Sequence, residues 1–375
     1  MKRSTNSLSG AVCVQVRASA AFALGNISVG NLSKNLPTLL GLIKQKLSEG
    51  SAATSHHGYL LFSALKEIIL SHSNDIAGLT EFRVYTDAIL PLLLANVGHA
   101  HEATRAMVAE CLGRLIVVDP AKLMLPLEKL VSSPQGEVRA CVITSIRFCL
   151  HPLMAYEYLY QNLASFLTPL LKDVDLEARR QTLLSINAIA RVNIESVPRD
   201  TLYSVILPTL YFETKVKPEL VKEVDYGAFK KIIDDGKPLR RAAYQTLQTL
   251  LEVTPHRIDL PEYIAAVKQG IHDDEDIQML TYQIFIELAK FHGSALLEII
   301  DQLPKLIMDS VKKYISEAKS KEPETALEVL RSIVRALLVF NQIPGVELCT
   351  QYSHFFKQVQ ATSIMQGLIA EQRAH

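Results

Sequence analysis

Two kinds of amphipathic segment alternate along this chain. In one kind, apolar residues recur at intervals of three, four and seven positions, as Leu183, Ile186 and Ala190 do. That spacing places side chains on one face of an α-helix. Five of these segments open with an arginine beside small or branched residues: Arg17, Arg105, Arg139, Arg179 and Arg240. Three more helices of this kind, without the arginine, are predicted over 58–70, 277–291 and 325–340.

The other kind of segment carries a proline within an apolar run. Proline cannot donate a backbone hydrogen bond and its ring crowds the preceding turn, so a proline inside a helix usually kinks it. The same residue type at the same relative place in six segments indicates a shared architecture. The six prolines are Pro37, Pro91, Pro126, Pro169, Pro208 and Pro304.

The spacing between corresponding positions identifies this architecture. Arg105 and Arg139 are 34 residues apart, and Arg139 and Arg179 are 40 residues apart. HEAT and armadillo units are of about this length, and they stack helices into a solenoid. An acidic residue two positions before the arginine, as at Glu137 and Glu177, is typical of a HEAT second helix. We therefore predict an all-α fold, a single HEAT-repeat α-solenoid over 1–375 with about eight helix pairs, the first pair incomplete.

One interval breaks this rhythm. Arg179 and Arg240 are 61 residues apart, about 21 more than the 40-residue interval before them. The extra length falls at 213–238. Two short runs on either side of Gly227 alternate there with a period of two, which is the spacing of a β-strand. The pattern predicts a β-hairpin inserted into the solenoid, closed by the Asp235–Gly236 turn before Pro238 restarts the helix.

The predicted hairpin is a candidate interaction site. An isolated two-stranded hairpin is marginal in water, and its apolar side chains are best explained if it docks on a partner. The alternative is a loop that folds back on its own repeat. The residues expected to contact a partner are Lys222, Val224, Tyr226, Gly227, Phe229 and Lys231.

The composition limits the classes of partner that we expect. Lys and Arg together number 39, as do Asp and Glu, so no overall field attracts nucleic acid or an anionic membrane. The longest stretches without a charged residue have 16 residues, whereas a membrane-spanning helix needs about 20. No apolar signal segment follows the basic residues of the N-terminus. We expect a soluble protein. The mixed charges of 312–324 are typical of a solvated loop between helices.

Residues that could carry chemistry are sparse. The five cysteines have no C-x-x-C pair and are expected to be free thiols in a reducing compartment, in the cytoplasm and nucleus. The neighbouring histidines His56 and His57, and His99 with His101, lack a carboxylate or cysteine at ligand spacing. We find no phosphate-binding loop and no hydrolase motif. We expect no metal, no cofactor and no enzymatic activity.

The first predicted helix, from Val16 to Ser28, has no proline-containing helix before it. The terminal repeats of a solenoid usually have a polar outer face. This helix instead carries the apolar residues Ala20, Phe22, Ala23, Leu24 and Ile27. We expect a cover for them: a missing N-terminal portion, a separate chain, or the first fifteen residues folded back.

Several segments resemble one known family of HEAT proteins. These segments are 16–30, 109–115 and 211–224, together with 234–236 and 241–243. They are similar to the C-terminal third of the Cand family, the cullin-associated, neddylation-dissociated proteins, and the resemblance covers nearly the whole chain. The segment 213–236 is its most specific part because generic HEAT proteins lack it.

The resemblance implies a role in the assembly of cullin-RING ubiquitin ligases. Cand proteins wrap around a cullin that is not neddylated. Their C-terminal repeats hold the N-terminal region of the cullin, and a hairpin there occupies the place where the substrate-receptor adaptor docks. Cand and adaptor therefore displace each other, and receptors exchange. The matching hairpin residues are Lys222, Val224, Gly227 and Phe229, with 234–236.

Two further expectations follow from this reading. The N-terminal portion of the family, or a separate chain that carries it, should pack on the helix from Val16 to Ser28. The alternative function is that of another HEAT scaffold, either a phosphatase scaffold or a nuclear transport receptor. Those proteins share the helix pairs but lack the 213–236 insertion.

Overall fold

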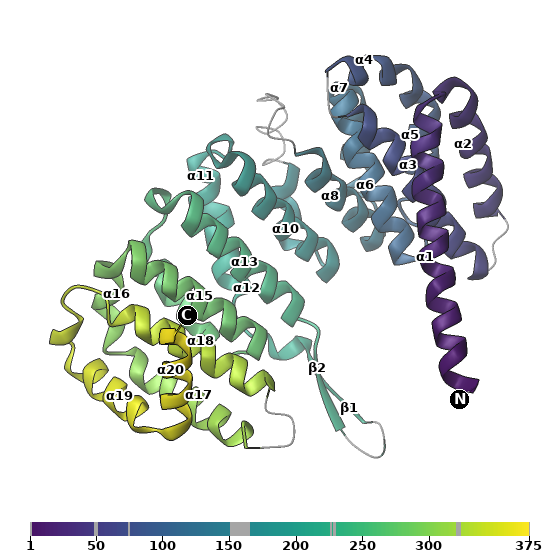
Figure 1. Ribbon diagram of the computed structural model, residues 1–375. Helices are drawn as coiled ribbons and strands as arrows, with labels where there is room; N and C mark the ends of the chain where they lie inside the picture. Colours follow the sequence, from purple (N-terminus) through teal and green to yellow (C-terminus); the bar gives the residue numbers. More distant parts are fainter. Residues whose placement is uncertain are drawn as a thin grey trace. The chain divides into compact units, whose positions relative to one another are not determined.

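Helices dominate the chain, which packs as two compact units, Met1–Ser196 and Val197–His375. The computed structural model describes residues 2–48, 52–73, 76–150, 166–225, 227, 230–319 and 324–374. No helix in these ranges is long and apolar enough to cross a membrane. The two units are coloured purple to teal and teal to yellow in Figure 1.

The first unit is a succession of helix pairs. Its elements are α1 (Lys2–Val29), α2 (Leu32–Ser48), α3 (Ala52–His72), α4 (Ile76–Phe82), η1 (Arg83–Tyr85), α5 (Thr86–Leu94), α6 (Glu102–Val118), α7 (Pro120–Leu130), α8 (Gly136–Cys149), η2 (Thr168–Lys172), α10 (Leu176–Asn193) and η3 (Ile194–Ser196). The helices α1, α3, α6, α8 and α10 form a row in which each contacts the next, and α2, α5 and α7 pack against that row (Figure 1).

The second unit repeats this arrangement and adds the hairpin. Its elements are α11 (Arg199–Thr201), η4 (Leu202–Ile206), α12 (Leu207–Glu213), η5 (Pro218–Leu220), β1 (Val221–Asp225), β2 (Lys230–Asp234), α13 (Lys237–Val253), η6 (Pro255–Arg257), α14 (Leu260–Val267), η7 (Lys268–His272), α15 (Glu275–Phe291), α16 (Gly293–Ile300), α17 (Leu303–Glu317), α18 (Glu324–Phe340), η8 (Val346–Leu348), α19 (Thr350–Ala361) and α20 (Ser363–Ala374). The helices α13, α15, α18 and α20 contact one another in that order.

This architecture confirms the predicted HEAT solenoid with an inserted hairpin. The arginine-free helices predicted over 58–70, 277–291 and 325–340 lie within α3, α15 and α18. The second helix α18 buries an apolar stripe of Val329, Leu330, Ile333 and Leu337. Burial of such a stripe between neighbouring helices is what holds a solenoid together, because no single closed core exists.

Two of the repeated arginines, Arg139 and Arg240, tie consecutive repeats together. Arg139 on α8 donates from Nε to Asp173 Oδ2 over 2.7 Å, and Arg240 on α13 donates from Nε to Asp273 Oδ2 over 2.8 Å. Both arginine–aspartate pairs are buried, and their paired hydrogen bonds use the fork of the guanidinium. The aspartate lies in the loop before the next second helix, so the arginine fixes the stacking of one repeat on the next.

Buried tyrosines join the first helix of one repeat to the second helix of the repeat before it. Tyr263 on α14 donates from its hydroxyl to the Leu247 carbonyl over 3.0 Å, and Tyr352 on α19 donates to the Leu337 carbonyl over 3.0 Å. Neither tyrosine is appreciably exposed. A buried hydroxyl is tolerated when it finds such an acceptor.

The proline prediction is confirmed for Pro37 and Pro126, which lie inside α2 and α7, and for Pro91, which lies inside α5. It is also confirmed for Pro208, which lies in an unbroken helical stretch from Arg199 to Glu213, directly after the π-helical turn Leu202–Ile206. Pro169 lies in the 3-10 helix η2, which continues the helical residues 166–167 without a break. The prediction is wrong for Pro304, which lies in the first turn of α17, where a missing N–H group has no cost because that donor has no helical partner.

Two predicted boundaries also need correction. The 213–238 insertion is narrower than predicted, because Glu213 ends α12 with 2% of its surface exposed and Lys237 already begins α13. The prediction of a loop over 312–324 is wrong for residues 312–317, because α17 continues to Glu317 and buries Tyr314 on its apolar face. Residues 320–323 lie outside the described part of the chain.

Candidate protein-interaction site

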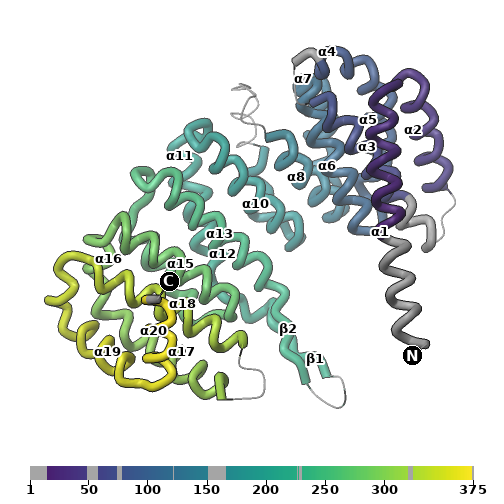
Figure 2. The backbone as a smooth tube through the Cα atoms, viewed as in Figure 1, coloured from purple at the N-terminus to yellow at the C-terminus, as the bar shows by residue number. Residues whose placement is uncertain are grey.

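The hairpin is a regular antiparallel strand pair. Lys222 is opposite Ile233, and Val224 is opposite Lys231. Among the described residues it forms the only sheet. The turn includes Gly227, whose φ of 79° lies in the left-handed region that favours glycine. Its N–H donates to Asp225 Oδ1 over 2.7 Å. Figure 2 shows the two strands leading away from the ends of α12 and α13.

One face of the hairpin carries the residues that the sequence predicted for binding. Opposite residues of two paired strands point to the same side, so Lys222, Val224, Lys231 and Ile233 share a face. Both lysines are exposed, and Val224 and Ile233 are half-buried. The structure therefore brings Lys222, Val224 and Lys231 together next to Gly227. Tyr226 and Phe229 lie outside the described residues.

The other face holds a residue that the sequence interpretation missed. The side chain of Ile232 is 69% exposed. Beside it, Lys230 Nζ lies 2.5 Å from Glu223 Oε1 across the strands. The apolar Ile232 could have been recognised from the β-branched pair at 232–233, because successive residues of a strand point to opposite faces. Only the structure shows that Ile232 is exposed within its own unit.

Arg240 anchors the base of the hairpin to the solenoid. Its guanidinium, 3% exposed, lies 2.8 Å from Asp234 Oδ2 at the end of β2 and 2.7 Å from Asp273 Oδ1 of the following repeat. Burial alone would lower the pKa of Arg240, but the hydrogen bonds to Asp273 and Asp234 outweigh it and raise the pKa. Arg240 therefore stays charged and joins strand, helix and next repeat at one point.

Further contacts limit how the hairpin can rotate at its base. The Asp235 N–H donates to the Leu220 carbonyl over 3.0 Å. Lys222 Nζ lies 2.6 Å from Asp235 Oδ2, and the Gly236 N–H donates to Asp234 Oδ1 over 2.9 Å. These bonds close the insertion where the sequence predicted a turn. These contacts give the strands a defined direction relative to α13.

A second exposed apolar surface lies on α1. The exposed fractions are 61% for Val16, 56% for Phe22, 38% for Leu24 and 70% for Ile27, and Ala20 and Ala23 are exposed as well. The opposite side of α1 packs on α3, where a side chain at Gly25 would meet the Ala64 carbonyl at 2.7 Å. The stripe expected to be open is therefore open among the described residues.

The structure offers little for catalysis or metal binding in its described part. Cys111, Cys141 and Cys149 are buried free thiols, and burial raises the pKa of Cys141 and Cys149 to about 12. They are protonated at neutral pH and poor nucleophiles. No group of three or more His, Cys, Asp or Glu residues is arranged for a metal ion within the described residues. The side chains of Cys13, His56 and His57 lie outside the described residues.

Solved structures with a similar fold are transport receptors. Kap95p bound to RanGDP superimposes with a TM-score of 0.67 at 12% identity, over 95% of this chain and 44% of that chain. Importin beta gives a TM-score of 0.62 at 13% identity, over 93% and 46% of the two chains. At such low identity the likeness shows the solenoid fold alone.

Sequence relatives are more specific. The family model TIP120, described as "TATA-binding protein interacting (TIP20)", matches residues 200–360, which include the hairpin. Cullin-associated NEDD8-dissociated protein 1 of Dictyostelium discoideum is 35% identical over 353 residues, 93% of this chain and 28% of the relative. The Drosophila melanogaster protein of that name is 34% identical over 94% of this chain and 28% of its own length.

A fungal relative agrees with the position of the match. It is the "Cullin-associated NEDD8-dissociated protein 1, C-terminal part" of Emericella nidulans, 29% identical over 86% of this chain and 30% of the relative. The chain thus spans about 30% of the length of these relatives. The similarity over nearly the whole chain, and the hairpin within the matched family segment, show that this chain belongs to the family of cullin-associated NEDD8-dissociated proteins, the Cand family, and corresponds to its C-terminal portion.

Proposed function

We propose that this chain is a non-catalytic scaffold that binds the N-terminal region of an unneddylated cullin and competes there with the substrate-receptor adaptor. It would thereby regulate the assembly of cullin-RING ligases and the exchange of their receptors. Membership of the Cand family and the names of the relatives support cullin association. The observation that carries the competition is the anchored hairpin, which exposes Lys222, Lys231 and Ile232.

The anchoring explains how so small an element could exclude a protein. A hairpin on a flexible tether could move aside, whereas one fixed by Arg240 through Asp234 keeps its place. Binding energy concentrates in a few apolar or aromatic anchors surrounded by polar groups. Val224 between the exposed Lys222 and Lys231 has this arrangement on one face, and the lysines can meet acidic groups. The helices would supply the broader cullin-binding surface.

The test removes the hairpin and keeps its anchor. Residues 222–232 are replaced by a short Gly-Ser linker, so that Asp234 still pairs with Arg240. We expect this variant to bind the cullin N-terminal region through its helices. Unlike the wild type, it should tolerate the adaptor in a ternary complex, seen as one peak in size-exclusion chromatography. Competition titrations with the adaptor measure the same effect.

The control is Glu223→Gln, which breaks the exposed pair with Lys230 and keeps the hairpin. Exposed pairs contribute about 0–1 kcal/mol, so its competition curve should match that of the wild type. If the deletion variant also gives the wild-type curve, the hairpin is only a spacer and the competition proposal is wrong. If the wild type itself fails to bind the cullin, the proposed function is wrong altogether.

The open stripe on α1 supports the proposal of a second partner. Val16, Phe22 and Ile27 are each more than half exposed, and exposed apolar patches of this kind mark interaction surfaces. We assign to this stripe the N-terminal portion of the Cand family, carried by the same chain or by a separate one. The relatives above are more than three times as long as the matched segment, so their length includes such a portion.

A further inference from the structure

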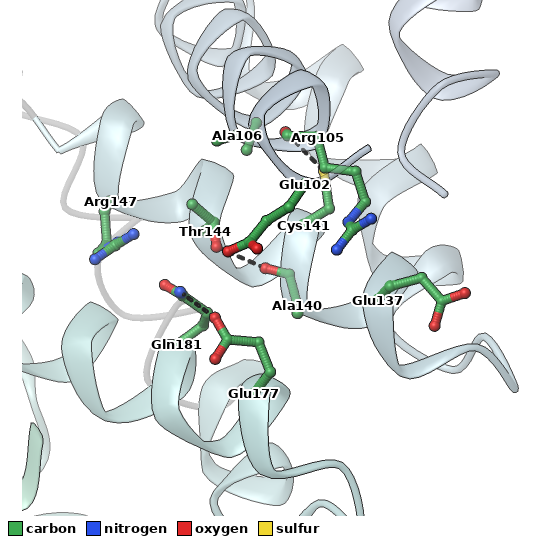
Figure 3. A pocket seen from close by; sticks show the side chains of 11 residues that line it. Glu102, Arg105, Ala106, Glu137, Ala140, Cys141, Thr144, Arg147, Glu177 and Gln181 are labelled. Atoms are coloured by element: carbon green, nitrogen blue, oxygen red, sulfur yellow. Dashed lines mark hydrogen bonds between the residues drawn. The ribbon is translucent and has the colours of Figure 1, made fainter. Parts of the chain in front are cut away.

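A pocket of about 320 Å³ lies on the helix row of the first unit. Residues of α6, α8 and α10 line it, and their side chains are drawn in Figure 3. Small side chains such as Ala106 and Ala140 leave the space between the helices open. Its polar lining includes three glutamates, Glu102, Glu137 and Glu177.

Two of these glutamates have unused acceptor capacity. Glu102 and Glu137 each lie in the first turn of their helix and are exposed. Neither makes an ion pair with a described residue. Glu177, in the first turn of α10, is already held by Arg180 through two hydrogen bonds of 2.7 and 2.6 Å. The helix dipole explains an acidic residue in a first turn, but it does not explain the next observation.

A buried side chain in the pocket lacks a donor. Gln181 is only 8% exposed and donates from Nε2 to Glu177 Oε1 over 2.7 Å. Its Oε1 atom has no hydrogen-bond partner. Figure 3 shows the Gln181 amide and the Glu102 and Glu177 carboxyl groups directed into the same space. Leaving a buried acceptor unsatisfied costs stability, so a ligand that brings a donor would restore what the free chain lacks.

The arginines that line the pocket, Arg105 and Arg147, do not donate a hydrogen bond to Gln181 Oε1. Arg105 donates to the carbonyls of His99 and Ala100 over 2.7 and 3.0 Å, so its guanidinium is already engaged. Arg147 is half-buried, and its own Nε has no acceptor. Burial, together with the charge of Arg180, lowers the pKa of Arg147.

We propose that this pocket takes a lysine or arginine side chain of a partner protein. The ammonium or guanidinium group would donate to Gln181 Oε1 and neutralise Glu102, whose carboxyl group is directed into the same space. Its aliphatic stem would pack on the alanines. The site lies outside the hairpin and adds a second, chemically different contact; naming the cullin as the protein that supplies the side chain rests on the proposed function.

The first experiment needs no cullin. The chain is labelled with ¹³C at its alanine methyl groups, and ethylguanidinium is titrated as the probe. Ala106, Ala109 and Ala140 line the pocket, so their methyl signals should shift with a saturating curve, whereas Ala243 and Ala336, buried in the second unit, should not. The shifts should be lost in Glu102→Gln/Glu137→Gln and absent with propionate. Equal shifts in the double variant, or none in the wild type, would overturn the assignment.

The second experiment measures affinity for the unneddylated cullin N-terminal region. We expect Glu102→Gln/Glu137→Gln to weaken binding about tenfold, because charge-assisted contacts at an interface are lost. The matched control, Glu81→Gln/Glu128→Gln, removes two exposed charges of the same unit outside the pocket and should bind like the wild type. Equal affinity of the two double variants would refute the cullin as the source of the side chain. No binding by the wild type would instead refute the proposed function.

A third variant separates binding from folding. Gln181→Leu removes the unsatisfied acceptor and should leave the thermal stability of the free chain unchanged or higher. The same variant should bind the cullin more weakly. A purely structural role for Gln181 would give the opposite pair of results, lower stability and unchanged affinity.

Discussion

At the scale of single residues, the repeated arginines have two different uses. Arg139 and Arg240 both pair with an aspartate of the following repeat, which couples neighbouring helix pairs. Arg240 additionally holds Asp234 at the end of β2. A residue of the repeat pattern therefore also positions the inserted hairpin.

Arg240→Met should reduce the free energy of unfolding by about 3–5 kcal/mol, because it leaves Asp234 and Asp273 without their buried partner. Chemical denaturation measures this loss. The neighbouring Arg241 is 53% exposed, and Arg241→Met should change the free energy by no more than about 0.5 kcal/mol. If both variants unfold at the same denaturant concentration, Arg240 is not the anchor described above.

The Arg139–Asp173 pair predicts a dependence of stability on acid. Burial alone would raise the pKa of Asp173, but the hydrogen bond from Arg139 outweighs it, and the pKa is lowered. A carboxyl whose pKa is lower in the folded chain adds stability above its unfolded pKa of about 3.9, and this stability is lost as the pH falls through the lower, folded value.

Asp173→Asn should therefore be less stable than the wild type at pH 7, and the difference should shrink between about pH 4 and pH 2. Urea denaturation at a series of pH values gives both curves. Two parallel curves over this range would show that Asp173 is not stabilised in its charged form by Arg139.

At the scale of elements, the hairpin is an insertion with two unequal faces. One face carries Lys222, Val224 and Lys231, and the other exposes Ile232. A partner that binds a strand pair usually contacts one of its faces. We therefore expect Val224 and Ile232, which lie on opposite faces, to contribute differently to binding. Replacing either residue by serine removes a β-branched apolar side chain from the same hairpin, so the two variants differ mainly in the face that they change.

Val224→Ser should weaken the ability of the chain to displace the adaptor about fivefold, corresponding to the loss of about 1 kcal/mol of apolar burial. Ile232→Ser should change it by less than about twofold. The measurement is an adaptor competition titration on a preformed cullin complex. The reverse ranking would place the contact on the Ile232 face and correct the residue assignment made from the sequence.

At the scale of the whole molecule, the chain corresponds to one portion of longer relatives, with 28% of the Dictyostelium protein covered. A solenoid can be divided between repeats because each repeat contacts only its neighbours. A repeat at the end of such a portion can therefore pack on the exposed Val16 and Ile27 of α1, which makes the proposed association with an N-terminal portion measurable.

A separately produced N-terminal portion of a Cand protein should form a one-to-one complex with this chain and raise its melting temperature, because a partner that binds only the folded state stabilises it. Ile27→Asp should abolish the complex by placing a charge in the apolar contact. Lys34→Asp, at an exposed position of α2, is the control. If the chain stays monomeric and its melting temperature does not change when the N-terminal portion is added, this proposal is wrong.

The sequence by itself determined the local structure and the family. Periods of about 3.6 and of two residues separate helix from strand without any tertiary information, so the helices at 277–291 and 325–340 and the hairpin about Gly227 could be predicted. The segment 211–224 carried the family resemblance because the insertion is absent from other solenoids. Helix ends were harder to predict. The charged residues from Lys312 onward suggested a loop, but α17 continues to Glu317 because its apolar face, which includes Tyr314, packs in the core.

Only the tertiary structure decided which distant residues meet. The partners of Arg139 and Arg240 lie 34 and 33 residues further along the chain, and each aspartate is an ordinary loop residue until two repeats stack. The pocket near Gln181 is assembled from α6, α8 and α10, and the exposure of Ile232 is seen only in the folded chain. Sequence periodicity reports which face of each element is apolar, whereas the stacking of one repeat on the next sets which polar groups are left without a partner.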